Sequence, residues 1–227
     1  MLRYALVTWG LSIFLGAANQ ALGQGQMALA SQPNKLAVAL GSVFGQVFVH
    51  EGGHAIAALS VGYRVEAFKP FPHICDGKFV AGCVEMGDAF GPGLVPGVGK
   101  KGKQVIISAM GSTFSVLGAA LTLPLLPTVR NTTNRLLLDQ MVTLQIADWP
   151  FYCLADLLGF QGDWYQVSRL TGISLWVLLP LSMIEFIAMN RYHHHYLEEA
   201  KSRYPDDYAD PEAALATPGL TLLRIGF

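Results

Sequence analysis

The 227-residue chain has few charged residues. Only 14% of its residues are Asp, Glu, Lys or Arg, whereas 52% are hydrophobic. A soluble domain carries roughly 25% charged residues, so this composition argues against a fully water-facing shell. The net charge of −1 gives no indication of a nucleic-acid partner. Internal repeats and low-complexity segments are also absent, and the length leaves no room for a second domain beyond loops and a tail.

Cysteine is scarce as well, with three residues in the chain. Cys75 and Cys83 could pair across a hairpin, although a loop on the cytoplasmic side would keep them reduced. Cys153 lies in an apolar run and is predicted to be a core residue.

Apolar runs long enough to cross a bilayer, about 17–25 residues, dominate the rest of the sequence. They predict an all-α polytopic membrane protein with about four to five hydrophobic helices, placed as a multi-pass protein in a plasma or inner membrane. The runs are Tyr4–Ala21, Leu36–Val61, Val105–Leu126, Leu136–Leu158 and Ile173–Met189.

Three segments follow from this pattern. Residues 1–23 are predicted to be a signal peptide or an N-terminal anchor, because small residues follow a short apolar run. Residues 24–192 form the main domain, and residues 193–227 form a polar C-terminal tail. The loop 63–103 is extended in character, and its Asp76-Gly77 pair is a strong turn signal. A small β-hairpin insertion is therefore expected there.

One apolar run contains the motif His50-Glu51-Gly52-Gly53-His54. On a helix, residues four apart share one face, so both imidazoles can bind one tetrahedral zinc ion. Glu51 is rotated away from them and is free to accept a proton from water. A charged group in an apolar span costs roughly 2.5–3.5 kcal/mol, so a glutamate beside two histidines there favours a functional site.

The paired glycines of the motif have two interpretations. Gly52 and Gly53 each cost about 1 kcal/mol of helix propensity relative to alanine. They could allow a substrate to approach the backbone closely, or they could serve ordinary helix packing between small residues. The sequence alone leaves both open.

The His50–His54 motif inside an apolar run resembles that of the site-2 protease family of intramembrane zinc metalloproteases. The segment Ala109–Ser115 resembles the family's Gly-Pro-x-x-Asn segment, with Ser112 and Ser115 in place of its Pro and Asn. The resemblance covers roughly residues 36–170. It implies a β-structured loop after the metal helix and an aspartate from a later helix as the third ligand.

The family's usual Leu-Asp-Gly context for that aspartate does not occur here. Asp163 is the preferred ligand, with Asp156 and Asp148 as alternatives. Asp163 also suits a helix N-cap, and Asp156 and Gln166 could serve as outer partners of the ligands.

The resulting prediction is a zinc metalloendopeptidase with Zn²⁺ as its cofactor. His50, His54 and Asp163 would hold the metal, and Glu51 would be the catalytic residue. The implied partners are a membrane-protein substrate and the lipid bilayer. Two alternatives remain, a catalytically silent membrane scaffold of the same fold and a membrane protein that handles or transports metal.

Overall fold

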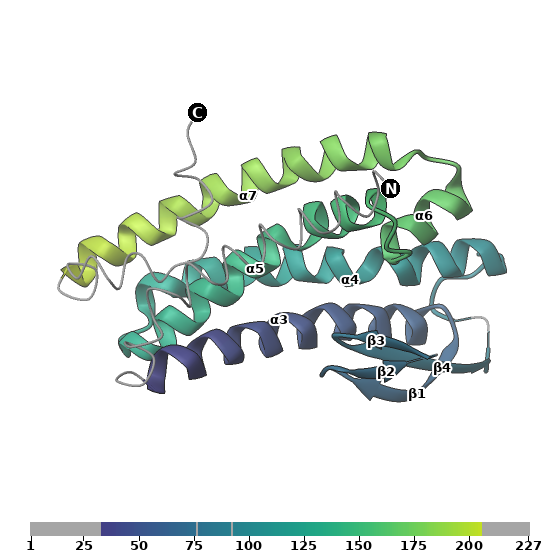
Figure 1. The fold of residues 1–227 in the computed structure, drawn as a ribbon, viewed down its shortest axis with the longest axis horizontal. Helices are drawn as coiled ribbons and strands as arrows, with labels where there is room; N and C mark the ends of the chain where they lie inside the picture. Colours follow the sequence, from purple (N-terminus) through teal and green to yellow (C-terminus); the bar gives the residue numbers. More distant parts are fainter. Residues whose placement is uncertain (1–32, 76, 92, 206–227) are drawn as a thin grey trace.

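The computed structural model describes residues 33–205 except residues 76 and 92. The predicted signal peptide or anchor at 1–23 and the end of the predicted tail, 206–227, lie outside the described residues. In this part of the chain four long helices run side by side, and a small β region lies with a short helix at one end of them (Figure 1). The long helices are α3 (Pro33–Ser60), α4 (Lys100–Thr122), α5 (Thr132–Leu157) and α7 (Leu175–Arg203), and the short one is α6 (Asp163–Thr171).

Local signals explain where several of these helices begin and end. Asn131 caps α5 by accepting a hydrogen bond from the backbone N–H of Asn134, and Ser174 caps α7 in the same way. The prolines after α4 fall in a 3₁₀ helix, η1 (Leu123–Thr128). Gly172 ends α6 with φ of 82°, in the left-handed region that glycine adopts without strain.

The loop after α3 forms two small antiparallel pairs of strands. β1 (Tyr63–Lys69) pairs with β4 (Cys83–Ala89), and between them β2 (His73–Cys75) pairs with β3 (Lys78–Val80). The expected hairpin is therefore present, and an additional strand pair joins its two ends. Together the strands lie beside the C-terminal half of α3 (Figure 1).

The interior of the bundle contains many polar side chains. Buried polar side chains include Gln46, His50, Asp139, Gln145 and Asp148. Buried apolar residues form small clusters, one of which consists of Ala57, Ala58, Val61 and Ile107. Many large apolar side chains instead face outward, including Phe44, Phe48, Trp176 and Ile184.

The length and hydropathy of the described helices correct the predicted fold class. The expectation of an all-α polytopic protein with four to five membrane-spanning helices is wrong. Among residues 33–205, one helix, Lys100–Thr128, is long and apolar enough to cross a membrane, judged by length and composition. The other apolar runs within residues 33–205 also form helices, but acidic, amide and histidine side chains interrupt them, as Asp139, Asp148 and Asp156 do in α5. The run Tyr4–Ala21 lies outside the described residues.

Candidate metal centre

His50 and His54 lie one turn apart on α3 and face the same way. Their Nε2 atoms are 3.1 Å apart, and the two rings meet edge to face with centroids 4.9 Å apart. His50 is buried, and the side chain of His54 is nearly so. The helical spacing in the sequence therefore produces the expected pair.

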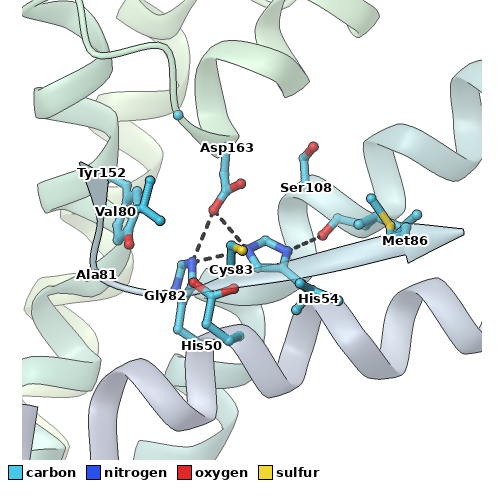
Figure 2. A pocket seen from close by; sticks show the side chains of 14 residues that line it. His50, His54, Val80, Ala81, Gly82, Cys83, Met86, Ser108, Tyr152 and Asp163 are labelled. Atoms are coloured by element: carbon cyan, nitrogen blue, oxygen red, sulfur yellow. Dashed lines mark hydrogen bonds and ion pairs between the residues drawn. The ribbon is translucent and has the colours of Figure 1, made fainter. Parts of the chain in front are cut away.

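Asp163 completes the cluster from the start of α6. Its Oδ2 atom lies 3.1 Å from Nε2 of His50 and 3.1 Å from Nε2 of His54 (Figure 2). Of the three aspartates that the sequence left open, Asp163 is the one whose carboxylate reaches both imidazoles.

The outer nitrogen of each imidazole has its own partner. Nδ1 of His50 lies 3.0 Å from Oδ2 of Asp148, and Nδ1 of His54 lies 2.7 Å from the carbonyl oxygen of Ile107. Both partners are acceptors, so the proton of each neutral ring belongs on Nδ1 and the lone pair on Nε2. Both lone pairs then point at Asp163. Partners of this kind orient metal-binding histidines in proteins.

The geometry of the three inner atoms fits a metal ion. Each pair is separated by 3.1 Å. In a tetrahedral zinc site with bonds of about 2.0–2.1 Å, neighbouring ligand atoms lie about 3.3 Å apart. Two lone pairs and a carboxylate oxygen at this separation repel one another unless a cation or proton lies among them. His50, His54 and Asp163 are therefore a candidate metal-binding set.

The charges of the cluster shift the ionisation of its members. Burial alone would lower the pKa of both histidines, but Asp148 and Asp163 raise the pKa of His50, and Asp163 raises that of His54. Burial likewise opposes ionisation of Asp163, yet His54 and His50 hold its pKa well below the ordinary range. In the site without metal, the neighbouring charges therefore favour protonation of the imidazoles and ionisation of Asp163.

Glu51 lines one cavity together with His50, His54 and Asp163, and the volume of this cavity is about 390 Å³. Burial raises its pKa, an effect that His54 and His50 partly oppose. One wall of the cavity is the segment from Val80 to Val84. A Cβ atom on Gly82 would lie 2.7 Å from Cγ of Glu51, so glycine lets this segment approach the carboxylate.

Asp156, considered in the sequence as an alternative ligand or as an outer partner of the ligands, bonds to backbone N–H groups instead. Its two carboxylate oxygens accept hydrogen bonds, each at 2.6 Å, from the backbone N–H groups of Gly162 and Tyr165. Asp156 on α5 thus caps α6 across the connecting loop 158–162, whereas Gly162 holds the N-cap position and Asp163 points at the histidines. Gln166 accepts a hydrogen bond from Arg169.

Outside this site, three consecutive histidines, His193 to His195, lie on α7, and His193 is the buried one. Nε2 of His193 lies 2.5 Å from Oδ1 of Asp139, which ties α7 to α5. Glu185 is a buried carboxylate without a hydrogen-bond partner among the described residues, and burial, with a smaller contribution from Asp148, raises its pKa to about 7.

Two contributors to the site were missed by sequence reasoning. Gly111 on α4 faces the imidazoles, and a Cβ atom there would lie 2.5 Å from Nε2 of His54 and 2.6 Å from Nε2 of His50. Tyr152 stacks on His50 with ring centroids 4.7 Å apart. Gly111 could have been found from its place in the small-residue segment Ala109–Ser115, whereas Tyr152 lacks any local signal.

No protein-family model matches the chain, and no curated protein or solved structure shows significant similarity to it.

Proposed function

We propose that the protein is a zinc-dependent metallopeptidase in which His50, His54 and Asp163 hold the ion. The convergence of three ligand atoms at 3.1 Å from one another, with both outer imidazole nitrogens engaged, carries this proposal. Two histidines and one carboxylate form a ligand set used by catalytic zinc sites, which keep a further position for water or substrate. The resemblance to site-2 proteases points in the same direction.

The roles of the side chains follow from their positions in the cavity. When bound, a zinc ion supplies a Lewis acid that polarises the scissile carbonyl and acidifies water. Glu51 accepts a proton from the attacking water and delivers it to the leaving amine nitrogen. The raised pKa of Glu51 makes its carboxylate a stronger base for the first of these steps.

The substrate class in this proposal is a segment of a membrane protein. Several large apolar side chains of α3 are about half exposed, among them Phe44, Phe48, Ile56 and Leu59. An apolar face of this kind marks a membrane or protein interaction surface. We assign it to lipid, because the same pattern extends to α7, at Trp176 and Ile184. The site would then lie near the bilayer in which its substrate is anchored.

The decisive experiment compares the purified wild type with Glu51→Gln. Both should contain one zinc ion per chain by metal analysis, and only the wild type should cleave membrane-protein substrates in detergent or vesicles. Equal cleavage by the two proteins would overturn the mechanism. A zinc-containing wild type as inert as Glu51→Gln toward such substrates would instead support the silent scaffold.

A further inference from the structure

A second group of residues with metal-binding side chains lies on the β strands, and it shares no residue with the candidate metal centre. Nε2 of His73 is 3.2 Å from Sγ of Cys83, and Cys75 and Cys83 form a disulfide. One ligand atom from each of His73, Cys75 and Cys83 lies within 4.8 Å of the other two. All three residues are partly buried.

Strand geometry explains why these side chains meet. Side chains alternate between the two faces of a strand, so His73 and Cys75 share one face of β2, whereas Ile74 faces away and is 70% exposed. The β2–β3 turn and the short link to β4 bring Cys83, the first residue of β4, back to this face.

His73 is oriented as a ligand would be. Its Nδ1 atom donates to the carbonyl oxygen of Phe71 at 2.7 Å, and its Nε2 lone pair therefore faces Cys83. The same arrangement, in which Nδ1 is bound to a backbone carbonyl, orients His54 in the candidate metal centre. A histidine needed only to pack against a disulfide has no requirement for a fixed tautomer.

We propose that this cluster is a thiol-dependent metal site for a thiophilic divalent ion such as Zn²⁺. A dithiol reductant gives two electrons and two protons to the Cys75–Cys83 bond, which breaks to form two thiols, while the reductant becomes a disulfide. Zn²⁺ then displaces both thiol protons to solvent and binds the two thiolates and Nε2 of His73. A disulfide oxidant reverses the reaction: it takes two electrons from the two thiolates and two protons from solvent and becomes two thiols, while the Cys75–Cys83 bond re-forms and the ion is released.

The location gives the second site a direct connection to the cavity. Cys83 lines the cavity, and its neighbour Gly82 packs against Glu51. Binding or release of the ion thus takes place in the cavity wall, Val80 to Val84, that faces Glu51. Any effect on peptide hydrolysis rests on the proposed function, whereas the metal site itself does not.

Cobalt titration tests the proposal without any activity assay, because Co²⁺ bound to thiolate has a charge-transfer absorption that histidine and carboxylate ligands do not produce. The full-length protein is reduced with a phosphine, desalted and titrated with Co²⁺, beside an oxidised sample. The reduced wild type should bind one more equivalent than the oxidised protein and should show the thiolate band. Cys153 is present in every sample and gives a constant background.

Variants make the result specific. Cys75→Ser/Cys83→Ser should lose the band, and His73→Ala should keep both thiols but bind at least about tenfold more weakly, since even loss of an outer partner costs 10–100-fold. Asp163→Ala should keep the band while losing the other cobalt ion, which separates this proposal from the proposed function. If the reduced wild type lacks the band, or binds no more Co²⁺ than Cys75→Ser/Cys83→Ser, the proposal is overturned.

Discussion

Asp148 on α5 accepts a hydrogen bond from Nδ1 of His50 on α3 at 3.0 Å, and both side chains are buried. The other carboxylate oxygen of Asp148 accepts from Nε2 of Gln46 at 2.6 Å, and Gln46 also lies 3.1 Å from Oγ of Ser115 on α4. Three helices thus hold one imidazole. The cluster is therefore a property of the packed bundle rather than of α3 alone.

Replacing Asp148 with asparagine tests this connection. The amide removes the negative charge that supports the Nδ1 proton of His50, so zinc affinity should fall by about 10–100-fold. Chelator competition on the purified protein measures the change. Asp139→Asn is a matched control on the same helix, because Asp139 pairs with His193 instead of a proposed ligand. Equal zinc affinity in wild type and Asp148→Asn would show that Asp148 does not support the metal.

The two glycines of the motif should respond in opposite ways to alanine. A Cβ atom on Gly52 would meet nothing within 4 Å, whereas one on Gly53 would lie 2.4 Å from the carbonyl oxygen of Met110. Gly52→Ala should therefore raise the free energy of unfolding by roughly 0.5–1 kcal/mol, and Gly53→Ala should lower it by about 1–3 kcal/mol. Denaturant titrations of both variants measure the difference. Equal effects would contradict the close contact between α3 and α4.

Gly111→Ala should empty the proposed zinc site. The new methyl group would have to occupy space within 2.6 Å of both Nε2 atoms, so the imidazoles must turn away. Metal analysis of the folded variant should show less zinc than the wild type. Gly118→Ala serves as the control on the same helix, because its Cβ atom would meet Gln145 and Val49 instead. Full zinc content in Gly111→Ala would contradict the assigned position of the metal.

Zinc affinity should rise with pH. In the protein without metal, neighbouring carboxylates raise the pKa of His50 and His54 above the ordinary value near 6.5, against the opposing effect of burial. Protons therefore compete with the ion below these raised values, and the competition ends above them. Zinc binding measured from pH 5 to 9 should strengthen until it passes the raised pKa values. A constant affinity across pH 6–8 would contradict proton competition at these histidines.

The sequence predicted the parts of this site that depend on local spacing and missed those that depend on packing. The i, i+4 histidines required only helical geometry, and the apolar runs located each long helix. The number of membrane spans could not be derived in this way, because polar residues such as Asp139 and Gln145 interrupt the runs and turn inward. Likewise, Asp148 and Asp156 differ from Asp163 only in where the folded helices place their carboxylates.

Alanine substitutions distinguish Asp163, the preferred ligand, from Asp156, which the sequence left as an alternative. Asp163→Ala removes a proposed ligand and should abolish tight zinc binding. Asp156→Ala removes the acceptor for two backbone N–H groups at the start of α6, which should cost about 0.5–2 kcal/mol of stability. Its zinc affinity should fall less, because Asp163 loses precise placement but keeps its carboxylate. If Asp156→Ala loses zinc while Asp163→Ala retains it, the two roles must be exchanged and the assignment of His50, His54 and Asp163 as the metal centre is wrong.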